Sequence, residues 1–154
     1  MLNKASSQPL NAKRKLDKRE IQNDKLNNWY FFDAKDQVLG RMASKIAKIL
    51  QGKHKPDFVP YRDMADNVVV INAKSIRVSG KKENQKVYTF YSGYPSGLKK
   101  KTLREMRAEK PEFLIWHAVT GMLPKNKLAK VRLKKLHIFQ GAENPYKDKQ
   151  FVNA

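Results

Sequence analysis

WYFFDAKDQVLGRMASKIAKILQG, residues 29–52, is the stretch that decides the fold class of this 154-residue chain. Four of its first five residues are aromatic, which favours a β-strand, and the lack of alternation predicts burial on both faces. From Leu39 onward the apolar residues take helical spacing, with arginine, serine and lysine on the opposite face. Gly52 suits a left-handed helix end. The stretch therefore predicts a buried strand followed by an amphipathic helix.

A second buried strand is predicted over residues 67–72, where the uniformly apolar, β-branched run VVVI is flanked by asparagines. A strand, a helix and another buried strand in succession indicate a right-handed βαβ unit. Residues 86–91 and 136–139 are also predicted as strands, which brings the expected number to about four. The sequence therefore predicts a single α/β domain around a mostly parallel sheet.

The C-terminal half of the domain is predicted to contain three short helices. Residues 102–105 match a capping box, which opens a helix that stops before Pro111. Pro111 suits the first turn of a second helix over residues 112–120, with Gly121 as its end. A short basic helix is predicted over residues 126–134. The expected core consists of residues 29–32, the apolar face of residues 39–50, residues 68–71 and residues 113–119.

Three parts are expected along the chain. Residues 1–28 are interpreted as a basic N-terminal extension, because their leucines and isoleucine follow no sustained period. Residues 29–141 form the α/β domain. Residues 142–154 are expected to be a tail without regular structure, and residues 92–101 a basic loop within the domain.

The composition restricts the class of protein. Lys and Arg number 33 against 14 Asp and Glu, a formal charge of +19, which indicates a polyanionic partner. A hydrophobic content of 40% is too high for a wholly disordered basic tail. No apolar run approaches the roughly 18 residues of a membrane span, so no membrane partner is expected. The absence of cysteine excludes disulfide scaffolds, thiol nucleophiles and iron–sulfur clusters.

Candidate catalytic groups are sparse. The three histidines fit no metal-binding pattern, and His117 is interpreted as a core or boundary residue. Asp57, Asp63 and Asp66 cluster between the helix and the second strand, where turn formation and pairing with Lys and Arg are favoured over a magnesium site. No glycine-rich nucleotide motif occurs. We expect no catalytic residue, no metal and no cofactor.

Four basic clusters lie at residues 52–56, 80–83, 98–101 and 125–135, with aromatic residues among them. Clustered cations bind phosphates, and exposed aromatic rings stack on unpaired bases, so the clusters predict a nucleic-acid interface. They do not distinguish RNA from DNA. The candidate contact residues are Arg41, Lys53, His54, Lys55, Lys81, Lys82, Tyr94, Lys99, Lys100, Lys101, Lys125, Lys127, Lys130, Arg132, Lys134 and Lys135.

The last basic helix is expected to carry the principal footprint. Lys127, Lys130 and Lys134 recur at three- and four-residue spacing, which predicts one charged stripe. Arg132 and Lys135 are expected to widen its cationic side, while Leu128, Val131 and Leu136 pack against the sheet. Residues 53–55 are expected to expose three further cations on a short loop. The footprint is completed by residues 99–101, on the preceding loop, and the turn at residues 121–126.

Several segments occur in an order and spacing typical of one family. They are residues 29–34 (WYFFDA), 39–43 (LGRMA), 52–55 (GKHK), 70–73 (VINA), 86–88 (KVY), 93–97 (GYPSG) and 121–126 (GMLPKN). Together they resemble the universal large-subunit ribosomal protein of family thirteen, in its bacterial form. The resemblance covers residues 29 to 144.

The resemblance implies a three-layer α/β/α fold and burial against large-subunit ribosomal RNA beside neighbouring ribosomal proteins. It also implies an early role in subunit assembly, a place in the cytoplasmic ribosome, and neither catalysis nor a small-molecule substrate. Two other interpretations stay open: a free RNA- or DNA-binding regulator that uses the same basic faces, and a nucleotide-binding α/β enzyme. Co-sedimentation with the large particle separates the ribosomal protein from the regulator.

Overall fold

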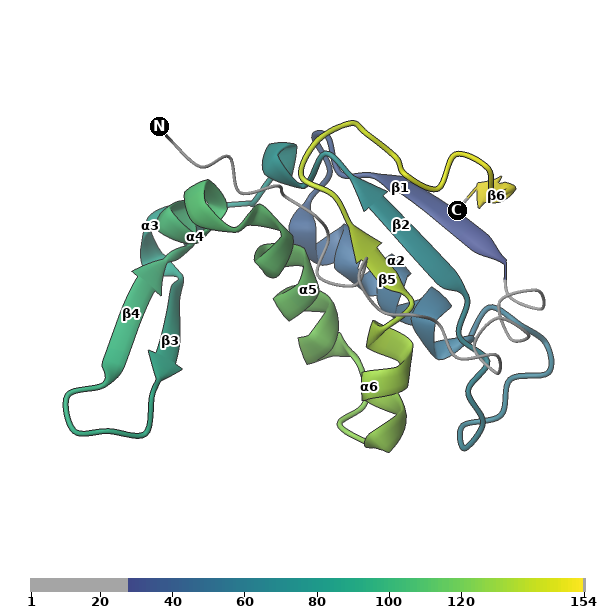
Figure 1. Ribbon diagram of the computed structural model, residues 1–154, viewed down its shortest axis with the longest axis horizontal. Coiled ribbons are helices and arrows are strands. Elements are labelled where there is room, and N and C mark those ends of the chain that lie inside the picture. The colour runs from purple at the N-terminus through teal and green to yellow at the C-terminus, as the bar shows by residue number, and fades with distance from the viewer. Residues whose placement is uncertain (1–27, 154) are drawn as a thin grey trace, which may run out of the picture.

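Strands β1 (Trp29–Asp33) and β2 (Asn67–Ile71) pair in parallel at the centre of a four-stranded sheet (Figure 1). Helix α2 (Leu39–Gln51) connects them, so the predicted strand–helix–strand unit is confirmed. This computed structural model describes residues 28–153. The expected N-terminal extension lies outside the described residues, except for Asn28.

The sheet has the order β5-β2-β1-β6, and its three strand pairs are parallel. Strand β5 (Leu136–Ile138) was expected from the sequence pattern, and strand β6 (Phe151–Asn153) was not. The α/β class and the parallel sheet of four strands are confirmed. The prediction of a tail without regular structure is wrong, because β6 pairs with β1 and supplies the fourth strand.

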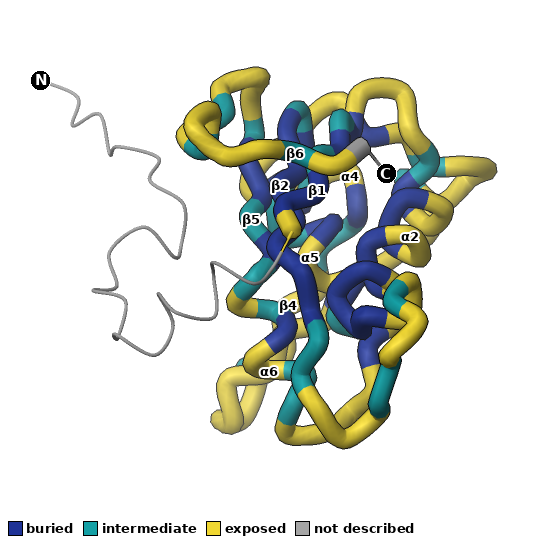
Figure 2. The backbone as a smooth tube through the Cα atoms, turned by 90° about the vertical axis from the view of Figure 1, so that its right-hand side faces the viewer, coloured by how far each residue is buried: buried dark blue, intermediate teal, exposed yellow. Residues whose placement is uncertain are grey.

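One face of the sheet packs against helices. Tyr30 and Phe32 of β1 join Val68 and Val70 of β2 in a core that α2 closes with Ile46, which is fully buried. Helix α5 (Pro111–Met122) packs beside α2 in the same cluster. Figure 2 shows the buried residues concentrated in the strands and on the inner sides of these helices.

The other face of the sheet is covered by the C-terminal segment. Trp29 and Val69 point to this side, because alternate residues of a strand face opposite ways. Their cover is Phe139, Tyr146 and Phe151, and the Tyr146 ring lies 5.0 Å from the Trp29 ring. Within the described residues, the segment that covers this face consists of turns and bends rather than a helix, and Phe151 reaches the same face from the edge strand β6.

Gly52 ends helix α2 as predicted, with a φ of 78° and its N–H donated to the Ile49 carbonyl. A Cβ atom at this position would lie 2.7 Å from the backbone oxygen of Met64, which is closer than side chains tolerate. Both the positive φ and the close approach of the returning chain therefore require glycine here.

A β-hairpin stands apart from the sheet (Figure 1). It follows the short helix α3 (Lys82–Gln85) and consists of the antiparallel strands β3 (Val87–Tyr91) and β4 (Leu98–Thr102). The strand expected over residues 86–91 is thus present, but outside the main sheet. Residues 98–101 belong to β4 rather than to a loop, because Tyr88, Phe90 and their neighbours give this lysine-rich segment a pairing partner.

Helix α4 (Leu103–Glu109) opens with the predicted capping box, in which Thr102 and Glu105 exchange hydrogen bonds. Helix α5 begins at Pro111 as predicted but runs through Gly121, so the assignment of Gly121 as its end is wrong. The shorter elements that remain are the 3₁₀ turn η1 (Ala73–Ser75) and helix α6 (Lys127–Leu133).

Helix α5 buries less of its apolar surface than expected. Leu114, Ile115 and Val119 are fully buried, which confirms part of the predicted core at residues 113–119. Phe113 is only partly buried, and Trp116 is 41% exposed. The prediction that this whole segment belongs to the core is therefore wrong for the outer side of the helix.

Replacing Ile46 with alanine should lower the free energy of unfolding by about 2–5 kcal/mol, because a fully buried side chain leaves a cavity. Lys45→Ala, one position away on the exposed side of α2, is the matched control and should change stability little. Thermal or urea unfolding followed by circular dichroism measures both. Equal effects of the two substitutions would contradict this orientation of the helix.

Tyr146→Ala should lower the free energy of unfolding by less than the ~1.5–3 kcal/mol of a fully buried side chain, because its partly buried ring covers Trp29 on the second face of the sheet. Tyr61→Ala serves as the control, since Tyr61 is 82% exposed. Urea unfolding of both variants tests whether the C-terminal segment is part of the domain. A Tyr146 variant as stable as the Tyr61 variant would mean that the segment contributes nothing.

Candidate nucleic-acid interface

The candidate cations divide into those that share a carboxylate and those that do not. The candidates that are exposed and have no carboxylate partner in the described part of the chain occur on helices α2, α3 and α6, on strand β4 and in three loops. A cation that is already paired has less charge to offer a phosphate. The unpaired set is Arg41, Lys53, Lys81, Lys82, Lys99, Lys100, Lys125, Lys127 and Lys130.

Helix α6 presents part of the predicted stripe. Asn126 caps the helix by accepting the Ala129 N–H at 3.1 Å, which sets the direction of its first turn. Lys127 and Lys130 are exposed on it, as is Lys134 just beyond its last residue. Val131 is 42% exposed, so the expectation that it packs against the sheet is wrong.

Arg132 and Lys135 point toward the interior rather than widening the stripe. Arg132 is 2% exposed, with its Nε atom 3.8 Å from Asp63 Oδ1. Lys135 Nζ lies 3.0 Å from Asp63 Oδ2 and donates to the Ala65 carbonyl at 2.8 Å. The prediction that Arg132 extends an exposed cationic face is therefore wrong, because a carboxylate on a distant loop holds it inside.

The loop after α2 is organised around Asp66, which is fully buried. Its oxygens lie 2.8 Å from His54 Nε2 and 2.6 Å from Lys55 Nζ, and one accepts the Asn28 N–H. Only Lys53 of the three expected cations is exposed without a carboxylate partner in the described residues. Burial and the charge of Asp66 also raise the pKa of Tyr30. The pairing of aspartates with nearby cations, preferred over a magnesium site, agrees with these contacts.

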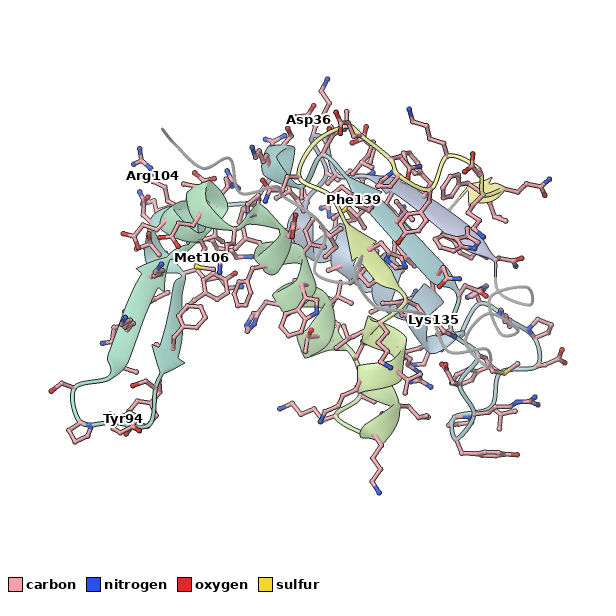
Figure 3. All side chains as sticks on the ribbon, in the orientation of Figure 1. Asp36, Tyr94, Arg104, Met106, Lys135 and Phe139 are labelled. Atoms are coloured by element: carbon pink, nitrogen blue, oxygen red, sulfur yellow. The ribbon has the colours of Figure 1, made fainter. Side chains whose placement is uncertain are left out.

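The hairpin carries a second basic group. Lys99 and Lys100 are exposed on β4, whereas Lys101 Nζ pairs with the carboxylate of Glu109 on α4. Tyr94 is 75% exposed at the hairpin tip, where Figure 3 shows its ring far from the sheet. Tyr88, on the neighbouring strand β3, is buried instead.

The structure distributes the candidate residues over several surfaces. The hairpin and α6 both extend toward the lower edge of Figure 1, on either side of α5. Lys81 and Lys82 lie at α3, near the base of the hairpin, and Lys81 lines an open pocket of about 580 Å³ beside Arg77, Arg107 and Glu83. Arg41 lies on the exposed side of α2.

Exposed aromatic residues on α5 were missed by the sequence pattern. His117 is exposed rather than a core or boundary residue, and its ring stacks on Phe113 at 5.4 Å. Trp116 stacks on the same ring at 6.1 Å. The sequence pattern offered no signal for this exposure, because a helix that is apolar around nearly its whole circumference is expected to be buried.

The described residues contain no group of three histidine or acidic side chains placed to hold a metal ion. Within residues 28–153, none of the helices combines the length and apolar content that crossing a lipid bilayer requires. The chemistry that remains at this surface is that of clustered ammonium and guanidinium groups with nearby aromatic rings, which suits a polyanion with stacked bases.

The known sequences that this chain resembles carry one family name. The profile of the family described as Ribosomal protein L13 matches residues 27–145. A protein of Dictyoglomus thermophilum, named Large ribosomal subunit protein uL13, is 53% identical over 118 residues, 77% of this chain and 83% of that protein. Proteins of the same name from Solibacter usitatus and Caldanaerobacter subterraneus are 48% identical over 124 residues and 51% identical over 118 residues.

These two relatives are covered to 87% and 82% of their length, and the match takes in 80% and 77% of this chain. The matched region contains β1, β2 and β5 of the sheet, all the described helices and the hairpin. Similarity at this level extends over the whole arrangement that positions the basic residues, so the chain belongs to the ribosomal protein L13 family.

Proposed function

We propose that this chain is a structural constituent of the large ribosomal subunit, where it binds large-subunit ribosomal RNA and supports early subunit assembly. Its role is binding rather than catalysis, and its partners are the RNA and neighbouring large-subunit proteins. The family carries the assignment to the subunit. The observation that carries RNA binding is the set of exposed cations without carboxylate partners in the described residues.

The charge of the chain supports a polyanionic partner. With a formal charge of +19, the free protein repels itself, and an RNA phosphate backbone removes that repulsion. The carboxylates of Asp63, Asp66 and Glu109 are already paired with cations of the same domain. The remaining exposed lysines therefore have few competing acids around them.

The proposed interface has two main parts on the domain of residues 29–141. The first is Lys125, Lys127, Lys130 and Lys134 around α6, and the second is Lys99, Lys100 and Tyr94 on the hairpin. Arg41, Lys53, Lys81 and Lys82 add separate contacts on other elements. The contributions of His54, Lys55, Lys101, Arg132 and Lys135 are expected to be smaller, because each already faces a carboxylate.

Such contacts position an RNA without reading its sequence. Lysine ammonium groups bind phosphate oxygens, which are the same for every nucleotide. Specificity for one ribosomal RNA site is expected to come from the shape of the folded RNA and from bases that reach the aromatic side chains.

Full-length chain produced in a bacterial cell should remain with the large subunit when ribosomes are centrifuged through moderately high salt. A structural constituent stays bound because many phosphate contacts are made together. Immunodetection across a sucrose gradient measures the distribution. Release of the whole chain into the free fraction, with binding to other RNA or DNA, would favour a free regulator instead.

Replacing Lys127 and Lys130 together with glutamine should weaken binding to a large-subunit ribosomal RNA transcript. It should also reduce the slope of log affinity against log salt by about 0.7–0.9 for each phosphate that the variant no longer neutralises. Filter binding over a salt series measures both quantities.

The matched control replaces Lys45 and Lys48 of α2, an exposed pair with the same spacing that belongs to neither main part of the proposed interface. Unfolding by circular dichroism should be unchanged in both variants. An equal decrease of affinity and slope from the two pairs would refute a localised interface on α6.

A further inference from the structure

Helix α5 has three sides, and only two of them are covered. Ile115 and Val119 pack into the main core with α2, and Leu114 packs into a second cluster with Tyr88 of the hairpin. The third side carries Phe113, Trp116 and His117, as expected from their spacing of three and four residues. An apolar helix side that faces solvent lacks a partner.

The hairpin extends this third side. Phe90 of β3 is 38% exposed, and its ring lies 5.7 Å from the Phe113 ring. We call Phe90, Phe113, Trp116 and His117 the aromatic platform. Phe113 is its centre, because the Trp116 and His117 rings both stack on it, with interplanar angles of 29° and 27°.

Contacts beneath the platform fix its rings. Tyr88 is buried below it and meets Phe113 and His117 edge-on, with ring centroids 5.8 Å and 5.2 Å apart. Rings held on two elements by such contacts lose little conformational freedom when a ligand binds. The platform is therefore a preformed group of mutually packed rings rather than a set of independent side chains.

The segment that carries the platform has an excess of basic residues. Lys99 lies directly across the hairpin from Phe90, so both side chains lie on the same face of the two strands. Residues 86–125 contain eight basic and three acidic residues. Two of the three acids already have partners: Glu109 pairs with Lys101, and Glu105 takes part in the capping box. The third, Glu112, is partly buried.

From this geometry we infer that the aromatic platform stacks against unpaired bases of RNA, with Lys99 on an adjacent phosphate. The inference rests on the proposed function and assigns a base-binding role to residues outside the predicted contact set. A base offers a flat π-face to the exposed Trp116 ring, and the positive rim favours a nucleic acid over a basic protein surface. A duplex keeps its bases stacked on each other, so single-stranded RNA is the expected ligand.

Tryptophan fluorescence of the full-length chain tests the inference. The chain has two tryptophans, of which Trp29 is 7% exposed and Trp116 is 41% exposed. A short single-stranded oligoadenylate should quench the emission of the wild-type chain. It should quench far less in Trp116→Phe, where only the buried Trp29 emits. The same oligoadenylate in a duplex with oligouridylate should cause little quenching.

Affinity for the oligoadenylate separates stacking from a structural effect. Trp116→Ala should weaken binding by about fivefold to 150-fold, the range expected for one base stacked on an aromatic side chain. Trp116→Phe should keep most of the affinity, because the flat ring remains. Met122→Ala is the matched control, since Met122 is also 41% exposed on α5 but lies outside the platform.

Three results would overturn the inference while leaving the proposed function intact. They are unchanged affinity in a folded Trp116→Ala variant, equal quenching by single strand and duplex, and crosslinking of residue 116 to a protein alone in purified large subunits. Failure of the proposed function is distinguishable, because the wild-type chain would then not bind the large-subunit ribosomal RNA transcript at all.

Discussion

The parallel pairing of β1 with β2 is the constraint on which the rest of the structure depends. A strand in this position buries both faces, so each face needs its own apolar cover. Helices α2 and α5 cover one face, and Tyr146 and the residues around it cover the other. Parallel pairing also requires a crossover, which α2 supplies and Gly52 turns back toward β2. Basic residues then occupy the outer sides and loops that the core does not use.

Elements with a strong period were predictable from sequence, and elements defined by their neighbours were not. Helix α2 and strand β2 have the predicted bounds to within one residue, because their hydrophobic patterns are long or uniform. Strand β4 is mostly lysine and exists because β3 lies opposite it. Strand β6 has three residues and no pattern of its own. Gly121 was misassigned because the packing of α5 carries the helix past it.

The candidate interface was predictable in composition but not in which cations are available. The basic clusters follow directly from sequence, whereas ion pairing depends on residues brought together by the fold. Lys135 contacts Asp63 and the Ala65 carbonyl, although they are far apart in the sequence. Arg132 is buried against the same loop. The exposed side of α5 shows the opposite case. Trp116 looks like a core residue in sequence, and only the arrangement of the hairpin leaves it uncovered.

The place of β6 in the sheet has a consequence for how the chain is made. Strand β6 comes after all the other described strands along the chain, yet its partner β1 is the first of them. During synthesis from the N-terminus, β1 can pair with β2 early, but its other edge stays open until residues 151–153 have been made. An open edge of a buried strand invites pairing with other chains. The nascent protein therefore passes through an aggregation-prone interval that lasts until β6 joins the sheet.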